Sequence, residues 1–519
     1  MGCGSVSPKL VIPCLGAASP PTPAAGMTYI RASEIGCALD CDLTTGLNKY
    51  KPGPATDDGP RINAAMAAAT ADNPITLIID GAASISGLFL PANGNWGIAG
   101  LGCSTGFFIR PGTNNDGIHN GPAAVIPSDP GPPAPPRGSN VTLQNFTING
   151  NQGNGRDGDS TSGKPQGGTQ AWYMGINLIN LNQITIENVV LVNMPSYHIR
   201  LSNVGNASIT GCVFSSQGPS TDGVHLDGPV NDISISNCEF TTGDDSIALN
   251  CPEGYSGNIS RVAVSGCTFN SYSLMRLYTK GSNGAQFTID TVSVDNCHGT
   301  LTEGAFLIGL NENSLPNSVA TLAVSNCELT APTILCLAEN FGTITLSNVT
   351  FRPFVSKVTW VKTGHDRTAA FARNSPLYGA NRFAGSNLVF ENCLISRNEN
   401  ENVAALILEN DSQIANLEFN GFTLQDPVLY FPVRDLLILE GGSVNQLTFD
   451  SIDPHDFTVP IEPEGFQKIG SIGGAGVLAT GWKFPDPVMA NGVPFISAET
   501  GLPTIKVHGF AQPYHPSQG

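Results

Sequence analysis

The tetrapeptide Ile235-Ser-Asn-Cys238 returns along the chain as Val264-Ser-Gly-Cys267, Val294-Asp-Asn-Cys297 and Val324-Ser-Asn-Cys327, and Ile209-Thr-Gly-Cys212 precedes it. The steps between these five cysteines are 26, 29, 30 and 30 residues. Zinc motifs pair their ligands at much shorter spacings, so the pattern does not indicate a metal site. We interpret it as one small buried thiol per structural repeat, stacked in a ladder inside the protein.

The residues around each cysteine repeat as well. An alternating strand opens each unit, a polar Asn or Gly turn follows, and a second short strand closes it. Alternation with period two predicts half-buried strands, and units of about 30 residues that contain two strands have no room for a helix. Such units bury their apolar faces only by stacking. The sequence therefore predicts an all-β fold, a right-handed single-stranded parallel β-helix, with these units: Gln183–Leu201, Ala207–Leu226, Asp232–Leu249, Ser260–Leu277, Thr291–Ile308 and Thr321–Leu337.

The two ends of such a stack need covers. We expect residues 1–56 to form an N-terminal arm, residues 57–465 the β-helix, and residues 466–519 a C-terminal β cap. One helix is predicted from Asp57, with Asp58 as its N-cap and Pro60 in its first turn, and it would cover the first rung. Cysteines of the arm could pair as disulfides, and these are Cys3, Cys14, Cys37 and Cys41.

Composition excludes several classes of protein. The 519 residues are 40% hydrophobic and 13% charged, which excludes a disordered chain. The net charge of −18 argues against a nucleic-acid partner, which needs a basic surface. No run of 18 apolar residues exists, so no membrane span is expected, and no signal peptide is visible at Met1. The oligomeric state is left open.

Carboxylates are scarce in the repeats, and two consecutive repeats depart from that rule. Ser220-Thr-Asp222-Gly-Val-His225-Leu-Asp227 and Gly243-Asp244-Asp245-Ser-Ile-Ala-Leu-Asn250 occupy the same place in their units. Aligning their closing strands stacks Asp222 on Asp245, with adjacent rungs about 4.8 Å apart. Carboxylates at that distance repel and separate their pKa values, which yields an acid and a base for glycoside hydrolysis. A cation site or simple turn residues are the alternatives.

These motifs resemble those of glycoside hydrolase family 28, the polygalacturonases, whose pattern is Asn-Thr-Asp, Asp-Asp, Gly-His-Gly and Arg-Ile-Lys. The resemblance implies a β-helix enzyme that inverts the anomeric carbon and acts without metal or cofactor on a polysaccharide or oligosaccharide. Asp244 would be the general acid, and Asp222 with Asp245 would activate water. It also implies a secreted or periplasmic location.

The chain departs from the family at the positions that bind uronate. Ser220 replaces the Asn, and an ungapped alignment of rungs puts Ser273 at the place of the His. Leu307 and Gly309 fall where the family has Arg and Lys. Without this basic clamp we expect a neutral or weakly charged glycan rather than galacturonan.

Other side chains near the aspartates are candidates for substrate binding. His225 and Arg276 take outward positions of their closing strands, in a column that also contains Arg200. The expected substrate-binding residues are His225, Arg276, Lys280, His198, Tyr197 and Glu303.

Two other functions remain open. A polysaccharide lyase or epimerase on the same fold would need a base and a cation that neutralises a uronate, and the aspartates could hold calcium for that purpose. A non-catalytic adhesin or tailspike-like stalk would not need three stacked aspartates, and this feature separates it from the enzymes.

Overall fold

A computed structural model describes the greater part of the chain. The described residues are 12–14, 16–19, 26–113, 115–120, 133–154, 156, 173–251, 253–279, 287–308, 319–337, 341–353, 368–374, 386–396, 403–409, 413–425, 433–440, 442–450, 457–461, 469–473, 489–490, 493–494, 504–507 and 510–513. They divide into two compact units, Met1–Asp244 and Asp245–Gly519. The boundaries expected at residues 56 and 465, between the arm, the β-helix and the cap, stay predictions.

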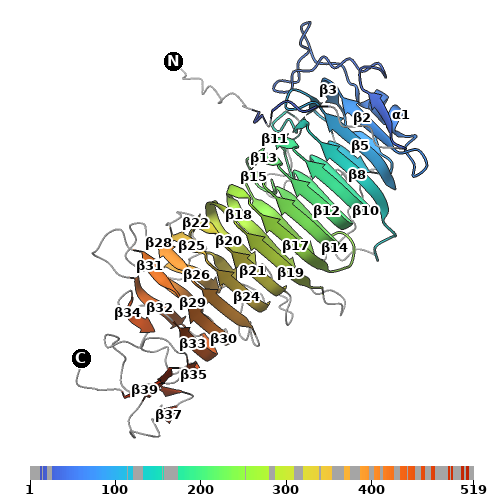
Figure 1. Ribbon diagram of the computed structural model, residues 1–519. Coiled ribbons are helices and arrows are strands. Elements are labelled where there is room, and N and C mark those ends of the chain that lie inside the picture. The colour runs from blue at the N-terminus through green and yellow to red at the C-terminus, as the bar shows by residue number, and fades with distance from the viewer. Residues whose placement is uncertain are drawn as a thin grey trace, which may run out of the picture. The chain divides into compact units, whose positions relative to one another are not determined.

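The N-terminal unit consists of short parallel strands and one helix, α1 (Gly59–Met66). Each strand pairs with a strand one rung further along, as β10, β12 and β14 do side by side in Figure 1. The strands are β1 Thr28–Arg31, β2 Ile75–Ile79, β3 Ala82–Ile85, β4 Leu88–Leu90, β5 Gly94–Gly100, β6 Gly106–Ile109, β7 Ile118–Asn120, β8 Gly138–Gln144, β9 Thr147–Asn149, β10 Ile176–Glu187, β11 Val190–Val192, β12 Ile199–Thr210, β13 Val213–Ser216, β14 Val224–Ser236 and β15 Glu239–Thr242.

The C-terminal unit continues the same pattern and ends differently. Its strands up to β35 pair in parallel, whereas β36 with β37 and β38 with β39 form antiparallel pairs in the region expected to be the cap. The strands are β16 Asp245–Cys251, β17 Ile259–Ser265, β18 Thr268–Thr279, β19 Ile289–Asp295, β20 His298–Ile308, β21 Val319–Ser325, β22 Glu328–Ala331, β23 Leu335–Leu337, β24 Phe341–Ser347, β25 Thr350–Pro353, β26 Thr368–Asn374, β27 Asn387–Glu391, β28 Leu394–Ser396, β29 Val403–Glu409, β30 Gln413–Asn420, β31 Thr423–Gln425, β32 Val433–Glu440, β33 Ser443–Asp450, β34 Phe457–Ile461, β35 Ile469–Gly473, β36 Met489–Ala490, β37 Val493–Pro494, β38 Thr504–Val507 and β39 Phe510–Pro513.

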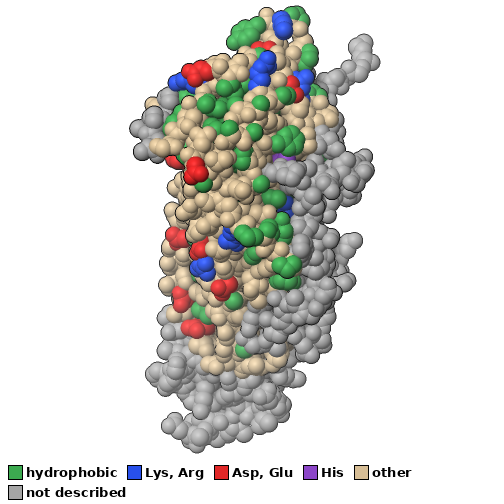
Figure 2. Space-filling model, turned by 90° about the vertical axis from the view of Figure 1, so that its right-hand side faces the viewer, with side chains coloured by type: hydrophobic (Ala, Val, Ile, Leu, Met, Phe, Trp, Pro, Cys, Tyr) green, Lys and Arg blue, Asp and Glu red, His purple; other side chains and the backbone are tan. Residues whose placement is uncertain are grey.

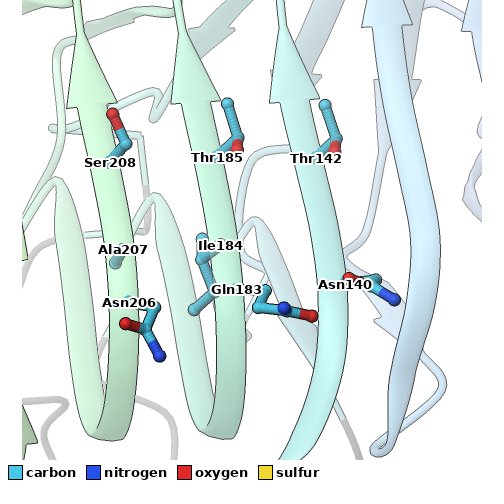
Figure 3. Close-up of a pocket in the computed structure, with 8 residues that line it drawn as sticks. All are labelled: Asn140, Thr142, Gln183, Ile184, Thr185, Asn206, Ala207 and Ser208. Carbon is cyan, nitrogen blue, oxygen red and sulfur yellow. The ribbon is translucent and has the colours of Figure 1, made fainter. Parts of the chain in front are cut away.

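The predicted fold class is confirmed: the protein is an all-β, right-handed parallel β-helix. Its core forms because equivalent apolar residues stack from rung to rung, as Ile176 on Ile199 and Ile199 on Val224 do. All three side chains are fully buried. Polar residues on the other side of the strands stack in the same way, and Figure 3 shows Thr142, Thr185 and Ser208 in one row.

The surface reflects the low charge content of the chain. On the face shown in Figure 2, charged side chains of the described residues are few and scattered among uncharged side chains and backbone. Nowhere in the described part of the chain does a helix reach the length and apolarity that crossing a membrane requires.

The position before each repeat cysteine has a backbone conformation that favours Asn or Gly. Asn237 and Asn296 have φ angles of 52° and 51°, and Gly211 and Gly266 have 63° and 62°. This left-handed conformation strains most residues, whereas Gly and Asn tolerate it. Among the turns, Asn188 Nδ2 also donates a hydrogen bond of 3.2 Å to Asn145 Oδ1 of the preceding rung. The repeated frame is therefore a turn signal joined to a buried thiol.

The cysteines that follow these turns are buried, as expected. Cys212, Cys238, Cys267, Cys297 and Cys327 are at most 2% exposed. A hydrogen bond with Cys267, aided by burial, raises the pKa of the Cys297 thiol to about 12. The sequence pattern did not include Cys393, which also follows an Asn with positive φ and is fully buried.

The helix begins where the sequence predicts, but its capping differs. Asp58 occupies the N-cap position without a side-chain capping bond. Its carboxylate instead accepts hydrogen bonds from the main-chain N–H groups of Ala38 (2.7 Å) and Leu39 (3.0 Å). Asp57 Oδ1 accepts from the N–H of Gly59 at 3.0 Å. Asp58 therefore connects the arm to the start of the helix, and Asp57 accepts the hydrogen bond from the first residue of the helix.

One cysteine of the arm forms a disulfide, but its partner lies outside the arm. Cys14 forms a disulfide with Cys103, which precedes β6. Cys37 and Cys41 are buried free thiols, and Cys3 lies outside the described residues. A bridge between Ala17 and Gly102 brings the arm beside the turn that contains Cys103, which explains the pairing.

The thiol ladder predicts a pattern of chemical modification. In the native protein, a thiol reagent should leave Cys212, Cys238, Cys267, Cys297 and Cys327 unmodified, because they are buried and the thiolate is the reactive form. The half-buried Cys336 is the internal control and should react first among the described free cysteines. Peptide mapping by mass spectrometry measures this, and rapid labelling of the five without denaturant would contradict the ladder.

Candidate active site

The segment before β14 brings Asp222 beside two histidines of the same unit. His225 Nδ1 lies 2.7 Å from Asp222 Oδ2. The main-chain oxygen of Asp222 accepts hydrogen bonds from both the N–H and the Nδ1–H of His198, each at 2.8 Å. Asp222 is 3% exposed and the two histidines are at most 1% exposed. The side chain and the backbone of Asp222 are thus held from two different rungs.

The His198 ring is held in one neutral tautomer. Ser216 Oγ lies 2.8 Å from its Nε2 and accepts a 2.7 Å hydrogen bond from the N–H of Met194. The serine hydroxyl therefore donates to Nε2, which leaves the ring proton on Nδ1, where it faces the Asp222 carbonyl. Burial lowers the pKa of His198 to about 4, and the bond to Asp222 opposes that change only in part.

His225 belongs to a longer buried network. Its Nε2 lies 3.0 Å from Asp227 Oδ1, and Asp227 Oδ2 accepts a 2.5 Å hydrogen bond from Arg200 Nε. Alternation along β14 puts His225 and Asp227 on the side of the strand opposite to the core residue Leu226. Register with β12 places Arg200 directly beside His225. These three polar residues are 1% exposed, although they point away from the core.

Aromatic and polar neighbours extend this network. The Tyr197 ring stacks on the His225 ring with 4.0 Å between centroids and 8° between planes. On the neighbouring rung, Asn177 Nδ2 donates to Asp116 Oδ2 at 2.8 Å, and Asn177 Oδ1 lies 3.4 Å from Arg200 Nη1. The network therefore spans several rungs of the N-terminal unit.

Asp244 contacts the turn that precedes Asp222. The N–H of Ser220, whose φ is 53°, donates a 2.8 Å hydrogen bond to Asp244 Oδ2. The N–H of Gly243 donates to Thr221 Oγ1 at 3.0 Å, so two hydrogen bonds join the two turns just before Asp222. Within this unit Asp222 and Asp244 therefore belong to two hydrogen-bonded turns.

Asp245 begins the first strand of the C-terminal unit. Ser273 Oγ donates a 2.6 Å hydrogen bond to Asp245 Oδ1, and the Arg276 guanidinium forms an ion pair with the other oxygen. The expected alignment of Asp245 with Ser273 is confirmed by the register of β16 and β18. Leu307 lies opposite Arg276, and Gly309 lies outside the described residues. The expected stacking of Asp222 on Asp245 concerns both units and stays a prediction.

Glu303 lies in an irregular part of β20. The register shifts between Ser271 and Ser273, which face Leu301 and Gly304, so the partner strand has one extra residue there. Such bulges redirect side chains. Glu303 is 3% exposed, and its two carboxylate oxygens have no hydrogen-bond partner among the described residues. Burial raises its pKa to about 7, and the nearby Arg276 opposes the rise. Lys280 lies outside the described residues.

The sequence interpretation missed the partners that hold these residues. Asp227 had no role in it, although it lies two residues after His225 and therefore on the same side of a strand. Ser216 gave no signal, because its contact with His198 joins different strands. The shallow pocket in Figure 3 is lined by residues of β8, β10 and β12 and contains none of the predicted site residues.

The central part of the chain is similar to a known family. Residues 137–329 match the family model of glycosyl hydrolases family 28. A probable polygalacturonase of Arabidopsis thaliana is 27% identical over 119 residues, which are 22% of this chain and 25% of that protein. The chain thus matches about a quarter of the length of this curated relative.

Solved structures share the fold at low identity. The bacteriophage Phi29 gene product 12 N-terminal fragment is 13% identical with a TM-score of 0.52, covering 93% of this chain and 73% of that chain. A family 28 exopolygalacturonase of Yersinia enterocolitica is 11% identical with a TM-score of 0.47, covering 85% and 80%. Residues 137–329 are thus similar in sequence to the family 28 enzymes, and the protein has a β-helix fold.

The His198 contacts predict a loss of stability in acid. The folded pKa of about 4 lies below the ordinary value of 6.5, so folding favours the neutral ring. The stabilising contribution is therefore complete above pH 6.5 and is lost as the pH falls towards 4, by on the order of 3 kcal/mol. Urea unfolding of wild type and His198→Gln across this range measures it. A difference between the two proteins that does not change with pH would contradict the assignment.

Proposed function

We propose that this protein is an inverting glycoside hydrolase that cleaves glycosidic bonds of a polysaccharide or oligosaccharide, with Asp244 as general acid and Asp222 and Asp245 activating water. The observation that carries the proposal is the hydrogen bond from the N–H of Ser220 to Asp244 Oδ2 at 2.8 Å. This bond holds the Asp244 carboxylate at the turn that leads into Asp222. Asp245 directly follows Asp244 in the sequence, so the three carboxylates come from two short segments of the chain.

The partners of Asp222 and Asp245 support their proposed role in activating water. Asp222 contacts His225, and Asp245 is paired with Arg276, so both have basic partners that suit a carboxylate. A general acid must carry a proton to the leaving oxygen, whereas the base needs an ionised oxygen near the water.

Substrate binding is proposed for the side chains around these carboxylates. Tyr197, His198, His225, Arg276, Lys280 and Glu303 are the proposed set. As part of this proposal, we place the protein in a secreted or periplasmic location. The Cys14–Cys103 disulfide agrees with an oxidising compartment.

The substitution Asp244→Asn tests the catalytic assignment. It should lower kcat by about 10²–10⁴, because general acid catalysis contributes on that order. Reducing ends released from a panel of polysaccharides measure the activity, and product NMR should show the inverted anomer. Asp290→Asn, an exposed change on β19, is the control and should retain kcat within about twofold.

Three outcomes would count against this function. A retained anomer would contradict the inverting mechanism. Unsaturated products that need calcium would indicate a lyase. A wild-type protein that is inactive on every glycan would favour a binding or structural role for the β-helix.

Substrate charge follows from the partners of the basic residues. Arg276 already faces Asp245, and Leu307 and Ser273 replace the basic residues of the family. A carboxylate on each sugar would therefore lose its hydration without a full set of basic partners. We expect kcat/KM on neutral α-glucans to exceed that on polygalacturonate, measured side by side. A clear preference for polygalacturonate would show that a basic clamp exists elsewhere.

A further inference from the structure

Two neighbouring side chains of the C-terminal unit are buried with polar atoms that no hydrogen bond satisfies. Among the described residues, neither carboxylate oxygen of Glu303 has a partner, and Thr333 Oγ1 has none. The two residues are 3% and 8% exposed. The N–H of Ala305 donates to the Thr333 carbonyl at 3.0 Å, and a methyl group on Gly304 would lie 3.6 Å from Thr333 Cγ2. Glu303 and Thr333 therefore occupy the same place on adjacent rungs.

Strand register connects this place with the proposed catalytic carboxylate of the same unit. Asp245 pairs with Ser273 of β18, and Ser273 pairs with Gly304 of β20. Glu303 lies in the bulge directly before Gly304, so it is two rungs from Asp245, about 10 Å along the stack. A sugar chain that binds at Asp245 and follows the stack would therefore bring another of its sugars to Glu303.

The unsatisfied carboxylate is a cost to the folded protein. Burial raises the pKa of Glu303 to about 7, which shows that the fold does not stabilise its charge. The guanidinium of Arg276 opposes this rise, but it forms its ion pair with Asp245. Buried polar groups are normally hydrogen-bonded, so a carboxylate with two unsatisfied oxygens is suited to a ligand that supplies the donors.

The chemistry of these acceptors selects the class of ligand. An ionised carboxylate only accepts hydrogen bonds, whereas the Thr333 hydroxyl can donate or accept. Adjacent hydroxyl groups of a sugar ring offer two donors to the two oxygens of Glu303. A uronate would bring a second negative charge against Glu303, and like charges repel. A metal ion would face the positive charge of Arg276, which acts on Glu303 electrostatically.

We propose that Glu303 is the specificity-determining residue of a sugar subsite two rungs from Asp245, where its carboxylate accepts hydrogen bonds from two hydroxyl groups of a neutral sugar and repels a uronate. Thr333 adds a further hydroxyl contact. This inference rests on the proposed hydrolase function and its neutral glycan. The absence of basic residues at Ser273 and Leu307 leaves a uronate without partners, whereas Glu303 actively excludes it.

The cost of the buried carboxylate can be measured without any ligand. At pH 8, above the folded pKa of about 7, Glu303 is ionised, so Glu303→Gln should raise the urea concentration at the unfolding midpoint. The matched control is Glu328→Gln, because the Glu328 side chain is 51% exposed in an ion pair with Arg352 and such pairs contribute little. A lowered midpoint in Glu303→Gln would show that the fold itself uses this carboxylate, and it would overturn the proposal.

Equilibrium binding at pH 8 tests the specificity without hydrolysis. The probes are an array of neutral oligosaccharides and oligogalacturonates, and every protein carries Asp244→Asn so that the probes stay intact. Adding Glu303→Gln should weaken binding of the neutral oligosaccharides about 10–100-fold, the usual effect of losing hydrogen bonds to a charged group. Affinity for the oligogalacturonates should stay the same or rise. Adding Glu328→Gln should change neither affinity by more than about twofold.

The outcomes separate this inference from the proposed function. An equal loss for both classes of probe, no loss, or no binding of any neutral oligosaccharide would overturn the role of Glu303. If Glu303→Gln does not fold, Thr333→Val takes its place, and an unchanged affinity for the neutral probes there would equally overturn the subsite. A wild-type protein that binds neutral glycans through Glu303 but cleaves none would refute the hydrolase function alone.

Discussion

In-register stacking of parallel strands is the constraint on which the rest of this structure depends. Each apolar residue lies on an apolar residue of the next rung, as Leu178, Leu201 and Leu226 do, and the rise per rung is about 4.8 Å. The same register acts on the outer side of the strands. Any polar residue there is carried to within contact of its equivalents one rung away. A buried outer column can therefore not contain a single charge, and it must contain a balanced set.

The column that contains His225 shows how the balance is reached. Arg200 donates a hydrogen bond to Asp227, and His225 Nδ1 lies at hydrogen-bond distance from Asp222. Asn177 donates to Asp116 and so extends the network. His198 adds no charge to this region, because its ring is neutral. Ser216 and the Asp222 carbonyl form hydrogen bonds with its two nitrogens. The His198 ring is therefore neutral because both of its partners are neutral groups.

The repeat frame predicted the fold because its signals are local. An Asn or Gly with positive φ before Cys238 or Cys267 ends one strand, and alternation identifies the next. Fixed rung spacing also gave the alignment of Asp245 with Ser273. Contacts between rungs that this alignment does not include could not be predicted from the sequence. Neither the disulfide from Cys14 to Cys103 nor the hydrogen bond from Ser216 to His198 follows from any periodicity, since each depends on how loops of unequal length fold back.

The acidic composition acquires a physical meaning from these pairs. A chain with 42 acidic and 24 basic residues has few cations to distribute. In the described part of the rungs that contain the three aspartates, Arg200 faces Asp227 and Arg276 faces Asp245. To bind a uronate, such an arginine would have to leave a carboxylate that then stays buried and unpaired, a cost of several kcal/mol. A neutral sugar requires no such exchange, because its hydroxyls can donate to carboxylates that are already paired. Internal charge balance is thus the physical reason why we propose an uncharged glycan as the substrate.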